Sequence, residues 1–434
     1  VTLAGDIIAE EGKLQLNGTA DVEALHLNSA DADSPAVIGV GGRATARTLA
    51  GGDNGGKLDI ASSGTLTLTG ATDGLSHTEI AGTGTLAIAE GASLGLAADS
   101  TLSGVVLDLG GARSLEADGS AGGLNGSGSL ELNGQTLQIQ AASGQTHTYE
   151  GTLGEGTLDI SGAGTQVLRS SGADTGLTIS GGNLVLQGKA DVDGARLSYG
   201  NLVNSGNLTI QASDNSLTAV NTTLSVENAS FSSGSATTFT LNTDADMTAS
   251  FIEISGDVVI EDGASFHVTS IPDVNITWKS GNPMELTLME LTGNGTIDLG
   301  ENTLTVGGLF LTYYKNAHLV QEGDKVVLKA EEQTDNVYAG VADTANSMAG
   351  ANLLWDAARH GSIDEAVTDF LGALNNNMLN NPSAARRSLA AMAGSTVNAL
   401  GTAQKDALRD QMGWIRNRTT LMGVNPAYVN DDLP

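Results

Sequence analysis

Residues 57–68 read KLDIASSGTLTL, and this stretch decides the fold. Residues 57–60 and 65–68 each alternate polar and apolar side chains, with Leu or Ile on one face and Lys, Asp or Thr on the other. Strict alternation of this kind indicates a short, half-buried β-strand. The residues between the two segments are small, and they include Ser62, Ser63 and Gly64, which are typical of turns.

The same pattern recurs along most of the chain, with Gly, Asn or Ser at the ends of each copy. Larger recurrences of about 20–28 residues fall in the range of solenoid rungs, in which each short strand pairs with the strands above and below. We therefore expect a mainly β protein, a right-handed parallel β-helix (β-solenoid), with a C-terminal α-helical region. A two-sheet sandwich is the competing fold, but it calls for fewer and longer strands. Further copies lie at residues 85–88, 129–132, 136–139, 157–160, 183–186, 207–210, 296–299 and 303–306.

The composition excludes several classes of protein. The chain has 434 residues and no cysteine, so disulfides and thiolate zinc sites are excluded. It has 58 glycines without a three-residue period, which excludes collagen. A net charge of −31 argues against a nucleic-acid partner, which requires a basic surface.

The negative charge divides the chain into two regions. Residues 1–335 carry 12 Lys and Arg against 41 Asp and Glu, whereas residues 336–434 carry 7 against 9. We predict a solenoid over 1–335 and a helical cap or linker over 336–434. Aromatic residues concentrate between Phe231 and Tyr314, and because large aromatic side chains bury the most area, we expect residues 231–335 to form the stable C-terminal rungs.

The second region carries helical signals. Apolar residues at helical spacing predict a helix over 336–360, which Gly361 would end. Ser362 has Glu365 three residues later, a capping box that predicts a helix to about residue 374. Ser383 is the expected N-cap of a long helix over about 384–421.

Two sets of residues resemble a known family. Residues 162–168 (GAGTQVL) and 171–187 (SGADTGLTISGGNLVLQ) look like the autotransporter-associated β-strand repeat. Residues 388–395 (SLAAMAGS) and 407–419 (ALRDQMGWIRNRT) look like the segment just before an autotransporter translocator barrel. The resemblance implies the passenger of a bacterial autotransporter (type V secretion), located at the cell surface and outer membrane or extracellular after release. It also implies a partner, the chain's own C-terminal outer-membrane barrel, which we expect to follow Pro434.

The same resemblance gives the last helix a role. Arg409, Trp414, Arg416 and Arg418 would belong to a linker or pore helix, with the arginines facing the acidic lumen of the barrel. A solvated basic helix face is the alternative interpretation.

Two motifs suggest catalysis, and both have a simpler explanation. Asp174-Thr-Gly176 matches the aspartic-protease triplet, which needs a second carboxylate close by, but it occupies the loop of a β-repeat. Ser93 lies in Gly91-Ala-Ser-Leu-Gly95, which matches the serine-hydrolase elbow. That elbow needs a helix after the serine, and here a strand-like segment follows.

We therefore predict that Asp174 and Ser93 are turn or rung residues and that the protein is not an enzyme. The six histidines show no metal-ligand spacing, so no metal or cofactor is expected. The function that follows is a structural or adhesive module, with a host glycan or surface protein as ligand. The alternative is a secreted hydrolase on the β-helix, either polysaccharide-cleaving or an aspartic-type protease. A cleft with clustered carboxylates and stacked aromatic residues would favour the hydrolase, and polar ladders on smooth rungs would favour display.

Overall fold

The computed structural model divides the chain into two compact units. One comprises Val1–Phe310 and Tyr314–Glu332, and the other comprises Leu311–Tyr313 and Gln333–Pro434. We name them the solenoid and the helical unit. The residues described are 5–31, 35–188, 195–211, 221–242, 248–249, 251–270, 284–307, 310–360, 370–371, 373–375, 377–378 and 381–391.

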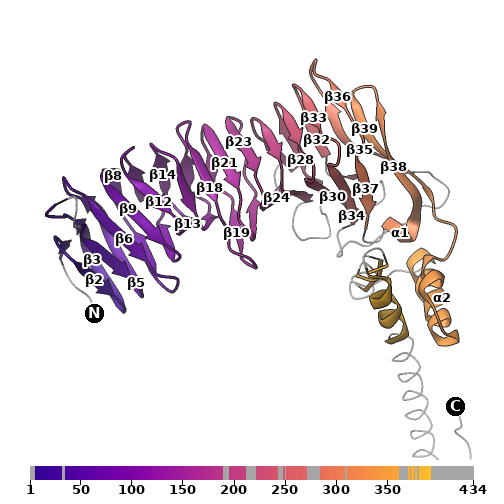
Figure 1. Cartoon of the computed structure of the whole chain (residues 1–434), viewed down its shortest axis with the longest axis horizontal. Helices are drawn as coiled ribbons and strands as arrows, with labels where there is room; N and C mark the ends of the chain where they lie inside the picture. The colour runs from indigo at the N-terminus through magenta and orange to yellow at the C-terminus, as the bar shows by residue number, and fades with distance from the viewer. Residues whose placement is uncertain are drawn as a thin grey trace, which may run out of the picture. The chain divides into compact units, whose positions relative to one another are not determined.

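The solenoid is built from short strands that stack rung upon rung, as Figure 1 shows. In the described residues, one 15-stranded sheet, here the long sheet, runs the length of the stack. All of its pairings are parallel except that of β31 (Thr248–Ala249) with β30. Its other strands, in order, are β1 (Ile7–Ala9), β3 (Thr19–Leu27), β5 (Arg43–Gly51), β7 (Thr65–Leu68), β10 (Thr85–Ile88), β13 (Val106–Leu109), β16 (Gly123–Gly126), β19 (Thr146–Tyr149), β22 (Thr165–Leu168), β24 (Asn183–Gln187), β27 (Asn207–Gln211), β30 (Ala236–Asn242), β34 (Ser265–Ser270) and β37 (Thr303–Val306).

Two five-stranded sheets form the other faces of the N-terminal rungs. We define a rung as one full turn of the chain, which contributes one strand to each of the three faces. The first sheet comprises β2 (Lys13–Leu16), β4 (Val37–Val40), β6 (Gly56–Ile60), β9 (Thr78–Gly82) and β12 (Thr101–Ser103), and the second comprises β8 (Ala71–Leu75), β11 (Ser93–Leu96), β14 (Ala112–Leu115), β17 (Ser129–Glu131) and β20 (Thr152–Leu153).

Two further sheets take over these faces in the C-terminal rungs. The eight-stranded sheet comprises β15 (Gly119–Ala121), β18 (Thr136–Ile139), β21 (Gly156–Ile160), β23 (Thr175–Ile179), β26 (Leu202–Asn204), β29 (Ala229–Phe231), β33 (Val258–Ile260) and β36 (Ile297–Asp298). The six-stranded sheet comprises β25 (Arg196–Ser198), β28 (Thr223–Val226), β32 (Phe251–Ile254), β35 (Met284–Leu291), β39 (Lys325–Glu332) and β38 (Tyr314–Glu322). Its last strands, β35, β39 and β38, pair antiparallel.

These parallel, in-register strands confirm the β-helix and exclude the antiparallel sandwich. The register places like residues in columns: Leu66 pairs with Leu86, which pairs with Leu107, which pairs with Leu124. All four side chains are fully buried. Each such burial stabilises the fold by about 1.5–3 kcal/mol relative to exposure. The right-handed sense of winding stays a prediction.

Glycines at one corner serve close packing between rungs. A Cβ on Gly128 would lie 1.9 Å from the carbonyl oxygen of Gly111, and a Cβ on Gly151 would lie 1.8 Å from that of Gly128. Real Cβ atoms essentially never approach this closely. These residues are therefore glycine because the neighbouring rung occupies the space of a side chain.

The predicted aromatic enrichment is visible in the core. Phe231 and Phe266 are fully buried and meet edge to face, with ring centroids 5.7 Å apart. Phe239 is also fully buried. Earlier rungs have their own buried rings, Tyr149 and Tyr199, and burial raises the pKa of both phenols. Trp278 lies outside the described residues.

The first long α-helix of the helical unit begins later than the sequence predicts. Instead of one helix over 336–360, a 3₁₀ turn, η1 (Val337–Val341), precedes α2 (Ala345–His360). Asn336 caps η1 through its side chain. The Thr344 hydroxyl accepts from the backbone N–H of Ser347 at 3.1 Å, which caps α2. The two caps divide the predicted helix.

The following helix also has a different cap. Residues 382–391 are helical, and the Asn381 side chain, rather than that of Ser383, accepts from the backbone N–H of Ala384 at 3.1 Å. Pro382 then occupies the first helical position, which suits its fixed φ and missing N–H. No described helix is long and apolar enough to cross a membrane. The continuation predicted to residue 421 lies outside the described residues.

Buried polar groups hold the helical unit together. Thr312, in α1 (Phe310–Tyr313), lies 2.7 Å from the Tyr338 hydroxyl and accepts from Asn375 at 3.0 Å. Burial raises the pKa of Tyr338 to about 12. The Tyr313 hydroxyl donates to the carbonyl oxygen of Ala358 at 2.8 Å.

One core side chain departs from the apolar columns. Arg113 of β14 is fully buried between Leu94 and Leu130, and all three of its guanidinium nitrogens lack a hydrogen-bond partner. Burial lowers the pKa of Arg113 to about 10, so the side chain remains charged at neutral pH. A buried charge without a partner is costly.

We predict that Arg113→Met raises the free energy of unfolding by about 1–4 kcal/mol, because an apolar side chain of similar length replaces an unpaired charge. The urea midpoint of the purified protein measures this. Arg43→Met, on the exposed surface of β5, is the control, and it should change the free energy by less than about 0.5 kcal/mol. A lower midpoint for Arg113→Met would show that the guanidinium stabilises the core.

A second prediction concerns local stability. Amides in the strands between Phe231 and Tyr314 should be the best protected in native-state hydrogen exchange, because buried Phe231, Phe239 and Phe266 add apolar area there. Solenoid stability is close to a sum of rung and interface contributions, so unequal burial produces unequal protection. Equal or greater protection over residues 60–190 would contradict it.

Candidate functional site

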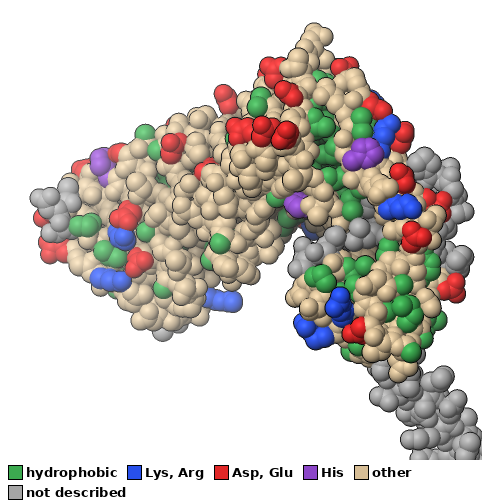
Figure 2. Space-filling model, turned by 45° about the vertical axis from the view of Figure 1, so that its right-hand side comes forward, with side chains coloured by type: hydrophobic (Ala, Val, Ile, Leu, Met, Phe, Trp, Pro, Cys, Tyr) green, Lys and Arg blue, Asp and Glu red, His purple; other side chains and the backbone are tan. Residues whose placement is uncertain are grey.

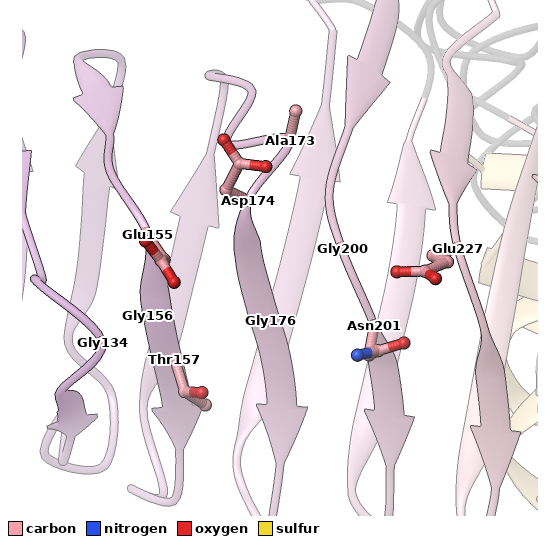
Figure 3. Close-up of a pocket in the computed structure, with 10 residues that line it drawn as sticks. All are labelled: Gly134, Glu155, Gly156, Thr157, Ala173, Asp174, Gly176, Gly200, Asn201 and Glu227. Atoms are coloured by element: carbon pink, nitrogen blue, oxygen red, sulfur yellow. The ribbon is translucent and has the colours of Figure 1, made fainter.

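A shallow trough crosses the turns that lead into the eight-stranded sheet. Glycine recurs here, in the turns at Gly134 and Gly200 and in the first residues of β21 and β23 at Gly156 and Gly176, and leaves the floor without side chains (Figure 3). Gly134 has a φ of +77°, a conformation that favours glycine, and a Cβ there would meet nothing within 4 Å. The floor is therefore open at Gly134.

Polar side chains from successive rungs form the sides of the trough. Its volume is about 610 Å³, and among the described residues that line it there is no Lys, Arg, His or aromatic side chain. The turns before β21, β23 and β29 each contribute one carboxylate, and the turn before β26 contributes an amide. The lining residues other than glycine are Glu155, Thr157, Ala173, Asp174, Asn201 and Glu227.

Backbone hydrogen bonds fix these turns to one another. Gly134 N–H donates to Glu155 O at 2.9 Å, and Glu227 N–H donates to Gly200 O at 2.8 Å. Neighbouring rungs lie about 4.8 Å apart, so the four steps from β18 to β29 span roughly 19 Å. The trough is thus a preformed, negatively charged surface for an extended ligand.

Asp174 lies in this trough, on an exposed turn before β23. Thr175 of the same triplet points inward and donates to Gly154 O at 2.7 Å. Figure 3 shows Glu155, Asp174 and Glu227 on separate rungs, spread along the trough. No hydrogen bond joins Asp174 to another described carboxylate, whereas the protease mechanism needs two carboxylates that share a proton.

Ser93 lies elsewhere, at the start of β11, where its register partners are Ala71 and Ala112. A strand follows it, not the helix that a nucleophile elbow requires. The structure therefore does not bring Ser93 and Asp174 together. Arg409, Trp414, Arg416 and Arg418 lie outside the described residues, so their predicted role stays a prediction.

Sequence reasoning missed three buried polar residues. Arg113, His147 and Gln166 each occupy an inward position of a strand, where the alternation calls for Leu, Ile or Val. In the sequence, they can be recognised as polar residues at positions where the alternating pattern of a strand otherwise has an apolar residue. Burial lowers the pKa of His147. In the described residues, no group of three or more His, Asp or Glu side chains is placed to hold a metal ion.

Replacing Asp174 or Ser93 with Ala should leave the fold and any hydrolytic activity of the protein unchanged, because Asp174 lies on an exposed turn and Ser93 at a strand start, and neither belongs to an assembled catalytic site. Circular dichroism, the urea midpoint and a hydrolase assay with casein and polysaccharide substrates measure this. If the parent protein shows a hydrolytic activity that either substitution abolishes, that residue is catalytic.

No protein-family model matches this chain, and a search of curated proteins also finds no match. The fold and the trough are therefore the basis for assigning a function.

Proposed function

We propose that this chain is the passenger of a bacterial autotransporter, displayed on the cell surface or released, and that it acts as a structural or adhesive module. The observation that carries the proposal is the long sheet, which runs from Ile7 to Val306 through parallel rungs in register. The resemblance of residues 162–187 to the autotransporter-associated repeat agrees with it. The proposal includes export through a translocator barrel in the outer membrane.

A stack of rungs suits a chain that must cross a membrane before it folds. Each rung packs only against its neighbours, so the fold can grow one rung at a time without distant contacts. The chain has no cysteine, so no disulfide can form prematurely in an oxidising compartment. These properties favour an exported module.

The outer surface is suited to contact more than to catalysis. On the face drawn in Figure 2, carboxylate side chains are scattered along the rungs among few Lys and Arg side chains. The trough adds a concave surface with three carboxylates, an amide and a hydroxyl. A polysaccharide-cleaving enzyme is the second candidate, and those trough carboxylates are the observation that favours it. No aromatic side chain is found among the described lining residues, and this favours adhesion over cleavage.

Display can be tested directly. We expect that the complete gene, expressed in a bacterium with two membranes, places the solenoid outside the cell. Protease added to intact cells should degrade it, while a periplasmic marker protein stays intact. A solenoid that is protected until the outer membrane is opened would contradict the autotransporter proposal.

Adhesion at the trough can be tested with a charge-matched pair of variants. The triple variant Glu155→Gln, Asp174→Asn, Glu227→Gln should bind host cells or arrayed glycans about tenfold more weakly than the parent, a loss of about 1.4 kcal/mol. The control Glu11→Gln, Asp53→Asn, Glu90→Gln removes the same charge from exposed positions outside the trough and should bind like the parent.

The outcomes separate the candidate functions. Equal weakening by both triple variants would assign the effect to net charge, and binding unchanged in both would exclude the trough as the adhesive surface. Cleavage of a bound polysaccharide by the parent, lost in the trough variant alone, would favour the hydrolase.

A further inference from the structure

The joint between β16 and β19 in the long sheet has little backbone pairing. Their register couples a single residue pair, Gly126 with Tyr149. The neighbouring joints, β13 with β16 and β19 with β22, each couple four pairs. The missing backbone pairing therefore has to be replaced by other groups, because buried peptide groups without partners are costly.

The Gln166 side chain supplies the first replacement. Gln166 lies on β22, one strand beyond β19, and is fully buried. Its Oε1 accepts from the Leu124 N–H at 3.0 Å, and its Nε2 donates to the Leu124 carbonyl oxygen at 2.8 Å. A glutamine amide offers the same donor and acceptor as a peptide group, so it stands in for a strand at Leu124 of β16.

Asn125 and His147 supply the second replacement. Asn125 Oδ1 accepts from the Thr148 N–H at 2.9 Å. Asn125 Nδ2 lies 3.3 Å from His147 Nδ1, so that nitrogen has to be unprotonated to accept. The opposite orientation of the Asn125 amide would not allow a protonated Nδ1, because it would place the NH₂ group against the Thr148 N–H, and two donors would then face each other. The joint therefore fits neutral His147.

The imidazole has little freedom to move away. His147 is 8% exposed, and its ring lies over Gly123, where a Cβ would come within 2.2 Å of a ring carbon. Gly123 thus leaves the space that the ring fills. A protonated ring would keep this place, lose the bond from Asn125, and carry a charge into the core.

We propose that the joint between β16 and β19 is an acid-sensitive opening point, at which protonation of His147 breaks the Asn125 bridge and separates the rungs on either side. Burial lowers the pKa of His147 below its ordinary value. The stability of the joint therefore depends on pH. The joint is intact above the unfolded-state pKa of about 6.5, and it weakens as the pH falls below that value and through the lower folded-state pKa.

In the part of the chain that the structure describes, no charged group serves His147 as a counter-ion. Strands β16 and β22 carry no ionisable side chain. Arg113 lies on β14, two strands before β16 in the chain. It is buried and is itself a cation. Three carboxylates near the joint lie to the outside: Asp108, the register partner of Asn125; Glu131, whose charge acts on the buried Tyr149; and Glu150, which pairs with Arg169 at 3.0 Å.

Hydrogen exchange on the full chain tests the proposal. Protection factors, corrected for the intrinsic rate, would be compared at about pH 7.5 and about pH 5, on either side of the ordinary histidine pKa. We expect amides in β16 and β19 to lose at least about tenfold in protection at the lower pH, ahead of β7 and β10. The variant His147→Gln should lose this pH dependence, and His318→Gln, at an exposed histidine, should retain it.

A second measurement does not depend on the variant folding. In the parent protein with isotope-labelled histidine rings, His147 should titrate below the ordinary histidine pKa of about 6.5. Unchanged protection of the joint at the lower pH, or titration of His147 at or above that ordinary value, would overturn the proposal.

Discussion

The parallel backbone ladder between successive rungs is the interaction on which the rest of the structure depends. Strands of three to five residues are too short to bury a core alone, and the ladder holds their inward side chains in columns such as Leu66, Leu86, Leu107 and Leu124. The same register sets the places where a side chain is forbidden, as at Gly128 and Gly151. Core, corners and outer surface therefore all follow from one repeated contact.

Because every rung depends on its neighbours, irregularities are informative. The two N-terminal face sheets end at β12 and β20, and different sheets continue at β15 and β25, while the long sheet continues across both changes. Within the long sheet, the joint between β16 and β19 replaces backbone pairing with Gln166, Asn125 and His147. Arg113 lies in the same part of the stack. This middle section thus combines polar burial with incomplete pairing, whereas the rungs around Phe231 and Phe266 are apolar and aromatic.

The trough illustrates how such a fold generates a surface. Turns that are similar in sequence arrive at the same corner of successive rungs, so glycines align as a floor and carboxylates align as sides. The result is an extended polar surface with regular spacing, which suits contact with an extended ligand. Catalysis requires groups that converge on one atom, and the trough carboxylates lie on separate rungs.

The sequence by itself determined the strand pattern, the solenoid, and the change to helix in the last quarter of the chain, because alternation and helical spacing are local properties of the backbone. It also identified Asp174 as a turn residue with a misleading motif. Only the tertiary structure decided which turns share a corner. It therefore placed Asp174 in the same trough as Glu155, Asn201 and Glu227. It also placed Arg113 in the core without a hydrogen-bond partner and set the partners of His147 and Gln166. Rung length along the long sheet varies from 17 residues, between Leu107 and Leu124, to 38, between Phe266 and Leu304. A variable rung length leaves the alternation of polar and apolar residues unchanged, but it alters which residues of neighbouring rungs meet. Only the stacking of the rungs in the tertiary structure therefore shows these pairs.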